Sequence, residues 1–240
     1  MKILESIKRF FNRYFFYDKW TCNACGKEIF NDEYFCDDCL NNLPLIKGAK
    51  CEHCGRKTIQ DETYCLSCKE RLIAVDKARS SFSYEKPINL SIQKYKYNGK
   101  KYLADLFTYY LFITATENLM TADYIVYVPM TEKSLKKRGF NHGKLLAEKL
   151  SIKMGIPVID VIEKTKETPR QAKLSRDERL ENLKGCFRLT KRKSIKGKSV
   201  LIVDDVITTG ATSETIANIL KRAGAKAVYL LTVASVPSKK

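Results

Sequence analysis

The sequence has 240 residues, of which 44% are hydrophobic and 30% are charged. This composition excludes a disordered chain, which would bury too little apolar surface to offset its ordering entropy, and favours one to two folded domains. Lysine and arginine number 44 against 27 acidic residues, and the formal net charge of +17 indicates an acidic partner. No stretch reaches the roughly 20 apolar residues of a membrane-spanning helix, so we expect no transmembrane protein.

The first twenty residues are basic and then aromatic. Arg13 interrupts their apolar run and no small-residue cleavage site follows, so we expect no secretory signal. Nine cysteines without an export signal are typical of a reducing compartment, where thiols bind metal or react more often than they form disulfides. We therefore expect a cytoplasmic protein.

Composition changes near Asp76. Residues 1–77 carry 13 basic side chains, 12 acidic side chains and eight of the nine cysteines, whereas residues 78–240 carry 31 basic and 15 acidic side chains. We therefore predict two domains, 1–77 and 78–240, with the excess positive charge in the second.

The eight cysteines of the first domain form an internal repeat. Two Cys-x-x-Cys pairs recur with every cysteine displaced by 29 residues, and ten residues separate the pairs in both copies. These cysteines are Cys22, Cys25, Cys36, Cys39, Cys51, Cys54, Cys65 and Cys68. Two such turns complete the tetrahedral thiolate set that Zn²⁺ prefers, and no position stays open for water, so we predict two structural zinc ribbons. The spacing leaves both sequential and cross-braced pairing open.

From residue 78 onward, apolar runs alternate with helical patterns, which is typical of an α/β domain with a parallel sheet and crossover helices. Gly155 and Pro157 are expected to end the first of two predicted helices. Cys186, the ninth cysteine, begins an apolar strand and is interpreted as a core residue. The predicted strands are 123–128, 157–162, 186–189, 200–203 and 227–234, and the predicted helices are 141–154 and 213–223.

The segment from Val200 to Thr212 reads VLIVDDVITTGAT. It indicates a buried strand that ends in Asp204 and Asp205, followed by a hydroxyl-rich loop that opens a helix. Ligands of parallel sheets collect at the carboxyl ends of strands, and helix N-termini attract phosphate. Two carboxylates beside such a loop can accept hydrogen bonds from the vicinal hydroxyls of a ribose, so the segment predicts a sugar 5-phosphate ligand. The sequence Gly197-Lys198-Ser199 lacks the glycine five positions earlier that a P-loop requires, which disfavours a P-loop nucleotidase. The threonine run disfavours a receiver-type Mg²⁺ site.

This segment resembles the phosphoribosyl-pyrophosphate (PRPP) binding motif of the type I phosphoribosyltransferases. The ComF (ComFC) family also has an N-terminal cysteine zinc module, so a resemblance to that family covers nearly the whole chain from Cys22. His142 and Lys164 stand where we expect Gln and Arg in that family. The runs that resemble it are Arg138-Gly-Phe-Asn141, Thr168-Pro-x-Gln171-x-x-Leu174 and Arg179-x-x-Asn182-x-x-Gly185-x-Phe187.

The resemblance implies the type I phosphoribosyltransferase fold, with a parallel-sheet core, a hood at 78–122 and a flexible lid at 163–184. Asp204 and Asp205 would hold the ribose hydroxyls and serve catalysis, and Mg²⁺ would bridge pyrophosphate and ribose oxygens. The implied PRPP-binding residues are Asp204, Asp205, Thr208, Thr209, Gly210, Ala211, Thr212, Met130, Thr131, Arg138 and Asn141. The implied lid residues are Lys164, Arg170, Gln171, Arg176, Arg179 and Asn182.

Cations alternate with aromatic rings within the hood range. Proteins bind single strands by following phosphates with cations and stacking bases on rings, so this run is a candidate nucleic-acid surface. An equally weighted alternative is a helix with Tyr95 and Tyr102 packed inward. The residues of the run are Lys94, Tyr95, Lys96, Tyr97, Lys100 and Lys101.

The resemblance implies a ComF-type phosphoribosyltransferase that binds PRPP with Mg²⁺, transfers a pentosyl group and acts in competence for DNA uptake (natural transformation). Its implied partners on the cytoplasmic side are imported single-stranded DNA and a ComFA-like helicase. The alternative is a nucleotide-salvage enzyme that joins a nucleobase to PRPP, and a third hypothesis is an adaptor that senses PRPP without turnover. The hood sequence identifies no acceptor.

Overall fold

The structure of the chain is a computed structural model. It describes residues 21–30, 33–56, 58, 63–69, 74–167, 176–190 and 195–237. Of the predicted lid residues, Arg170 and Gln171 lie outside the described residues, as do the side chains of Arg176 and Arg179.

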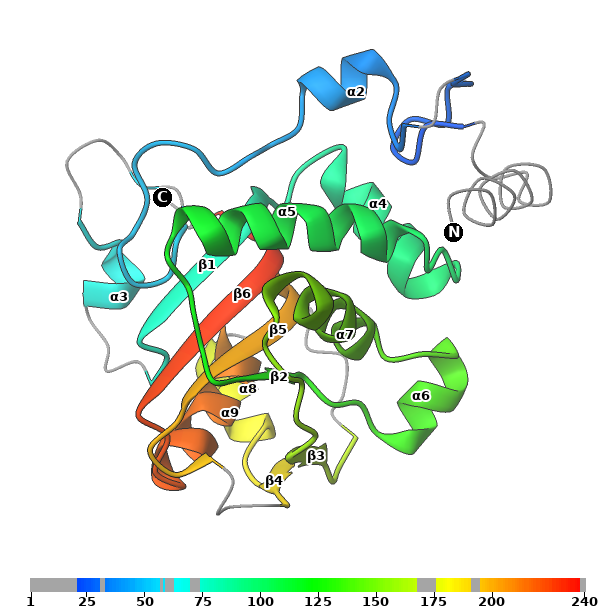
Figure 1. Ribbon diagram of the computed structural model, residues 1–240. Coiled ribbons are helices and arrows are strands. Elements are labelled where there is room, and N and C mark those ends of the chain that lie inside the picture. The colour runs from blue at the N-terminus through cyan, green and yellow to red at the C-terminus, as the bar shows by residue number, and fades with distance from the viewer. Residues whose placement is uncertain are drawn as a thin grey trace.

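Four parallel strands form the central sheet (Figure 1). Their order is β1-β6-β5-β2, so β5 lies inside the sheet between β6 and β2, and every neighbouring pair runs parallel. This arrangement confirms the predicted α/β class. The bounds are Lys77–Ser83 for β1, Tyr124–Tyr127 for β2, Ser199–Ile207 for β5 and Ala227–Ser235 for β6.

The strand predicted at 157–162 belongs to the sheet only in part. Val158 forms a parallel bridge with Ile125 of β2, after which the chain leaves the sheet. It then forms β3, Ile162–Lys164, which pairs antiparallel with β4, Phe187–Leu189. The side chains of Ile162 and Phe187 are buried in one cluster, and this burial favours the departure of the chain from the sheet.

Strand β5 is longer than the predicted 200–203. It continues to Ile207 because β6 runs beside it, with Asp204 opposite Thr232. Asp204 and Asp205 therefore lie within the paired strand rather than after it.

Helices cover both faces of the sheet (Figure 1). Alternate side chains of β5 point to opposite faces, so Leu201 and Val203 share one core with α5 and α7, and Val200 and Ile202 share another with α9. The predicted helices 141–154 and 213–223 correspond to α7 and α9. The helix bounds are Ile88–Tyr97 for α4, Leu103–Glu117 for α5, Glu132–Arg138 for α6, His142–Met154 for α7, Arg176–Asn182 for α8 and Ala211–Arg222 for α9.

The range 78–122, predicted as a hood, contributes to three parts of the domain. Its first strand, β1, is the edge strand beside β6, and α5 packs on the sheet. The end of α4 reaches β5, where Lys96 contacts Asp205.

The two cysteine modules dock at different places. The first contains α2, Asp37–Asn41, and its Tyr34 stacks on Tyr102 with 6.3 Å between ring centroids. The second contains α3, Leu66–Lys69, and lies against β1, where the Ala78 N–H donates to a ribbon carbonyl at 2.6 Å. The first module thus supports the helical layer and the second supports the sheet edge.

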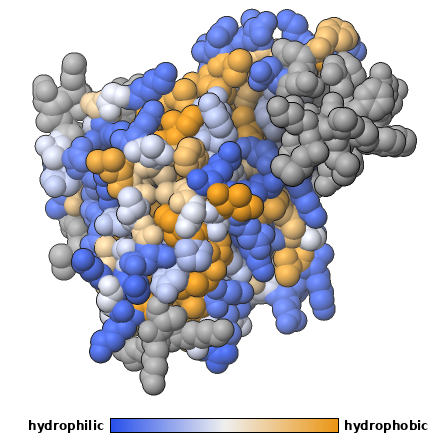
Figure 2. Space-filling view, in the orientation of Figure 1, coloured by the Kyte–Doolittle hydropathy of each residue, from blue (hydrophilic) through white to orange (hydrophobic). Residues whose placement is uncertain are grey.

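The surface that includes α5 is mixed in character. Figure 2 shows hydrophobic residues near the middle of this face, with hydrophilic residues around them. In the part of the chain that the structure describes, no helix has both the length and the apolar character needed to cross a bilayer.

We expect Gly55→Ala to destabilise the protein more than Gly26→Ala does. Both glycines follow the second cysteine of a Cys-x-x-Cys turn, and their backbones are left-handed, with φ of 68° and 80°. A Cβ on Gly55 would lie 2.5 Å from the carbonyl oxygen of Ala78, whereas a Cβ on Gly26 would meet nothing within 4 Å. The free energy of unfolding should fall by about 1 kcal/mol for Gly26→Ala, from backbone strain, and by roughly 2 to 4 kcal/mol for Gly55→Ala. Denaturant unfolding measures both, and equal losses would contradict the docking of the second ribbon on β1.

Candidate functional site

Two groups of four thiols lie where the repeat predicts zinc. In each group the sulfur atoms lie within 4.8 Å of one another, so the pairing is sequential. The Sγ atoms of Cys25 and Cys36 are 3.7 Å apart, and those of Cys54 and Cys65 are 3.6 Å apart. Zn–S bonds of about 2.3 Å in a tetrahedron require sulfur atoms about 3.8 Å apart, so both groups fit Zn²⁺ with every position filled by thiolate. The groups are Cys22, Cys25, Cys36 and Cys39, and Cys51, Cys54, Cys65 and Cys68.

The predicted phosphate loop lies at the carboxyl end of β5. Gly210 has a left-handed backbone with φ of 81° and immediately precedes the first residue of α9. The Ser213 hydroxyl donates to the Gly210 carbonyl at 2.9 Å and holds the first turn of that helix. Asp204, Thr232 and the loop residues 208–212 line a hollow of about 40 Å³. The structure therefore brings Asp204 and all five predicted phosphate residues to one hollow at a helix N-terminus, where anions bind favourably.

The two adjacent carboxylates have different surroundings. Asp205 is 8% exposed, and its Oδ1 lies 2.7 Å from Lys96 Nζ. Burial, and next the charge of Asp205, raise the pKa of the Asp204 carboxyl to about 7. Although burial opposes it, the charge of Asp205 raises the pKa of Lys96. Asp205 thus has a fixed countercharge, while Asp204 lines the hollow with a carboxyl that titrates near neutral pH.

The structure corrects the nucleic-acid prediction for Tyr95 and Lys96. Tyr95 is fully buried, and its hydroxyl donates to the His142 carbonyl at 2.9 Å. The buried positions of α4 recur every three or four residues, so the helix turns Tyr95 into the core. Lys96 is paired with Asp205. The inward-packed alternative therefore holds for Tyr95, and Lys96 is the ion-pair partner of Asp205 on β5.

Other residues of that run remain at the surface. Tyr97 is 67% exposed, and the Arg138 guanidinium lies 5.5 Å from its ring centroid. The Lys101 ammonium lies 5.1 Å from the ring centroid of Phe140, and Lys94 shares a helix face with Tyr97. Arg138, which is predicted to bind PRPP, thus also contacts Tyr97 of α4. We call Lys94, Tyr97, Lys100, Lys101 and Arg138 the basic–aromatic edge.

Residues 128–131, which the family resemblance implies form the pyrophosphate loop, follow β2 and lead into α6. Thr131 is the N-cap of α6, and its hydroxyl accepts from the Ser134 N–H at 3.2 Å. The same hydroxyl donates to the Glu167 carboxylate, which Ser134 also contacts at 3.0 Å. Met130 is half-buried beside them. The loop is therefore held by helix capping and by a carboxylate from the lid range, and its contact with pyrophosphate stays a prediction.

Asn141 and His142 join neighbouring elements. The Asn141 side chain accepts from the Lys144 N–H at 3.0 Å as the N-cap of α7, and its amide donates to the Val128 carbonyl at 3.3 Å. His142 Nε2 lies 3.0 Å from the Lys96 carbonyl oxygen, and burial lowers the pKa of this histidine. These contacts fix the loop of residues 128–131 and the end of α4 to the start of α7.

Two predicted lid residues are described. Lys164 lies on β3 with its ammonium 5.7 Å from the Phe187 ring centroid, and burial lowers its pKa. Asn182 is exposed at the end of α8, and its carbonyl accepts from Cys186 Sγ at 3.1 Å. Cys186 is 3% exposed, which confirms it as a core residue. The roles of Lys164 and Asn182 toward pyrophosphate stay predictions.

Sequence patterns do not indicate three residues that the structure brings to this region. Lys96 reaches Asp205, Glu167 reaches Thr131, and Arg56 of the second ribbon donates to the Thr208 carbonyl. Arg56 and Thr208 are 152 positions apart, so no local motif could connect them. For Lys96 alone, a helical pattern gives a partial indication. The buried positions of α4 include Tyr95 but not Lys96, so the two neighbours point in different directions.

We expect Asp204→Asn to stabilise the folded protein above neutral pH. The pKa of Asp204 in the fold, about 7, exceeds the roughly 3.9 of an unfolded aspartate, so the natural chain loses stability as pH rises between these values. Asparagine carries no charge and avoids this loss. The gain in free energy of unfolding should be near zero at pH 4 and about 1 to 3 kcal/mol at pH 8. Thermal unfolding of both proteins at both pH values measures this gain. A gain at pH 8 that is no larger than the gain at pH 4 would contradict the burial of this charge.

Comparison with known proteins agrees with this architecture. The family described as Phosphoribosyl transferase domain matches residues 135–240, and the Double zinc ribbon domain matches residues 15–69. The chain is 27% identical to Competence protein F of Haemophilus influenzae, over 87% of this chain and 82% of that protein. It is 33% identical to DNA utilization protein YhgH of Escherichia coli K12, over 61% of this chain and 66% of that protein. It is 28% identical to Competence protein ComFC of Bacillus subtilis, over 56% of this chain and 53% of that protein. With a double zinc ribbon before a phosphoribosyltransferase domain, the chain belongs to the ComF family.

Proposed function

We propose that this chain binds PRPP with Mg²⁺ at the hollow formed by Asp204 and residues 208–212. The observation that carries the proposal is the meeting of the Asp204 carboxylate from β5 with the N-terminus of α9 at one hollow. The helix N-terminus and the threonine hydroxyls suit a 5-phosphate. Asp204 and Asp205 suit the vicinal hydroxyls of a ribose, because carboxylates accept strong hydrogen bonds.

The remaining residues suit the pyrophosphate end of the ligand. Thr131 and Arg138 would contact the pyrophosphate, and Lys164 would approach it from the lid. Mg²⁺ prefers oxygen ligands and would neutralise the pyrophosphate oxygens, with Asp204 and Asp205 beside it. Fixed cations around pyrophosphate stabilise the charge that develops as its bond to the sugar breaks. The contribution of the chain to pentosyl transfer would be positioning, charge stabilisation and exclusion of water.

We further propose that the chain acts in competence for DNA uptake. The support is its similarity to relatives named Competence protein F, ComFC and DNA utilization protein YhgH. In this proposal the chain works on the cytoplasmic side of the membrane, with a ComFA-like helicase as a partner.

The basic–aromatic edge is the proposed contact with single-stranded DNA. Tyr97 offers an exposed ring for base stacking, and the guanidinium of Arg138 beside it suits a phosphate. Residues 78–240 carry 31 basic and 15 acidic side chains, so the field around this edge favours an anionic polymer.

Isothermal titration with PRPP tests the binding proposal. The natural chain should bind PRPP in the presence of Mg²⁺, and Asp205→Asn should bind at least about tenfold more weakly, because it removes a charged hydrogen-bond acceptor. Asp123→Asn is the matched control, since Asp123 accepts from the Ser199 N–H at 2.8 Å at the opposite end of β5. An absence of Mg²⁺-dependent PRPP affinity in the natural chain would reject the site.

A second comparison separates competence from nucleotide salvage. Pyrophosphate release from PRPP would be followed with a panel of acceptors that includes nucleobases and single-stranded DNA. Loss of transformation in a strain with Asp204→Asn and Asp205→Asn is the outcome that competence predicts. Release on addition of one nucleobase, with transformation intact, would favour salvage.

Charge reversal tests the DNA contact. Lys94→Glu with Lys101→Glu should weaken binding of single-stranded DNA and reduce the slope of log affinity against log salt by about 0.7 for each phosphate that is no longer neutralised. Tyr97→Ala should weaken binding about tenfold by removing a stacking surface. Lys153→Glu, at an exposed lysine in the last turn of α7, is the control for charge reversal away from this edge, and its effect is compared with that of either single reversal. Affinity that persists at high salt and ignores these changes would contradict the proposal.

A further inference from the structure

One side chain connects the second zinc ribbon to the phosphate loop. Arg56 follows Cys54 by two residues, and its Nη2 donates to the Thr208 carbonyl. The Arg56 carbonyl accepts from the Cys51 N–H at 2.8 Å, so the metal-binding turn itself holds the Arg56 backbone. The geometry of the metal-binding turn therefore fixes the backbone position from which the Arg56 side chain extends.

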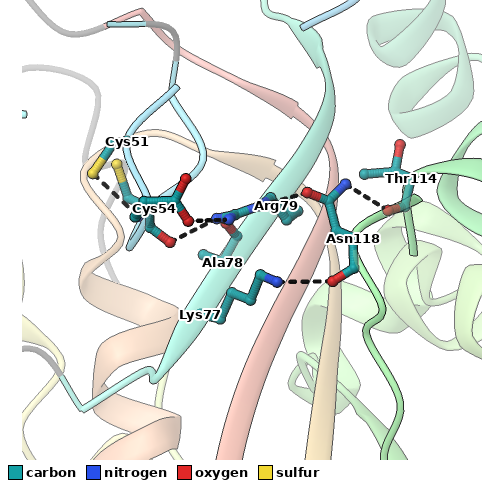
Figure 3. A network of polar contacts seen from close by, with 8 residues as sticks. Cys51, Cys54, Lys77, Ala78, Arg79, Thr114 and Asn118 are labelled. Atoms are coloured by element: carbon teal, nitrogen blue, oxygen red, sulfur yellow. Dashed lines mark hydrogen bonds and ion pairs between the residues drawn. The ribbon is translucent and has the colours of Figure 1, made fainter. Parts of the chain in front are cut away.

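The second ribbon is firmly docked on the sheet edge (Figure 3). The Ala78 N–H donates to the His53 carbonyl at 2.6 Å. Arg79 of β1 is 3% exposed. Its guanidinium donates to the Glu52 carbonyl of the ribbon at 2.9 Å and to Asn118 Oδ1 at 2.8 Å. Figure 3 shows this side chain between the ribbon and the end of α5. Moving a buried arginine away from its partners is costly, so the ribbon is a fixed support for Arg56.

Holding the Thr208 carbonyl also sets the direction of the next N–H. In a planar trans peptide the C=O and N–H point in opposite directions. Because the Thr208 carbonyl points to Arg56 on the ribbon side, the Thr209 N–H points away from the ribbon. A loop whose N–H groups are already oriented loses less conformational entropy when a phosphate binds.

The first ribbon provides an internal comparison. Lys27 occupies the position that corresponds to Arg56 in the repeat, displaced by 29 residues. Its ammonium lies 3.6 Å from the carboxylate of Asp38, and both side chains are mostly exposed. The same position thus makes a surface ion pair in one ribbon and a contact with the phosphate loop in the other.

We propose that Arg56 is a positioning residue for the phosphate loop and that the second zinc ribbon thereby supports PRPP binding. The second half of this statement rests on the proposed function. The ribbon is then part of the support of the binding site, as well as a module that zinc holds together.

Arg56→Ala and Lys27→Ala, made in the full chain, test the proposal. Zinc content should stay at two per chain in both variants, which shows that the ribbons are intact. Arg56→Ala should bind PRPP about tenfold more weakly in isothermal titration, because it removes a charge-assisted hydrogen bond behind the loop, whereas Lys27→Ala should match the natural chain. Arg56→Lys should recover part of the affinity. Should Arg56→Ala fail to fold, Arg56→Gln replaces it with the same expected loss, and an affinity within twofold of the natural chain would overturn the proposal.

Hydrogen exchange separates this proposal from the PRPP proposal, because it needs no ligand. The amides of residues 208–213 should exchange faster in Arg56→Ala than in the natural chain, while the amides of residues 200–203 keep their protection. Unchanged exchange at 208–213 would overturn the positioning role even if PRPP binds. A natural chain that does not bind PRPP, together with a loosened loop in Arg56→Ala, would reject the PRPP proposal and keep the positioning role.

Discussion

The candidate site depends on two adjacent carboxylates of β5, Asp204 and Asp205, whose negative charges must be compensated at the border of the core. β5 stays paired with β6 to Ile207, and this pairing places Asp204 and Asp205 at the border of the core. Buried acidic groups are unfavourable unless a cation, hydrogen bonds or a ligand compensate them. Lys96 compensates Asp205 at 2.7 Å, while the pKa of Asp204 is raised by burial and by its neighbour. Among the residues that the structure describes, the Asp204 carboxyl is thus left without a cation of its own, and a ligand that brings hydroxyl groups and a metal ion would compensate it.

Lys96 can serve this purpose because its helix is fixed in place. Its carbonyl contacts His142 Nε2 at 3.0 Å, and the buried Tyr95 hydroxyl donates to the His142 carbonyl. The end of α4 is thereby attached to the start of α7, next to the loop of residues 128–131. The range predicted as a hood thus supplies a cation to the acidic pair. Arg56 contacts the loop that follows β5, so Asp205 and the Thr208 carbonyl each have a positive partner from outside the segment 200–212.

Sequence patterns predicted the features that short stretches of chain determine. The cysteine repeat predicted two four-thiol groups, and VLIVDDVITTGAT predicted a strand, a loop and a helix in the observed order. Features that depend on distant partners were not predictable in the same way. β5 extends past Val203 because β6 continues beside it, and the chain after Val158 leaves the sheet to pair with β4. The ion pair of Lys96 and the contact of Arg56 likewise join residues that no local spacing relates.

A crystal structure of the protein with PRPP and Mg²⁺ would show directly whether the hollow beside β5 is the binding site. We expect the 5-phosphate in the hollow at residues 208–212, in contact with the N-terminus of α9. The ribose hydroxyls should lie within hydrogen-bond distance of Asp204 or Asp205, with the pyrophosphate toward Thr131. PRPP bound elsewhere, with this hollow empty, would exclude the proposed site.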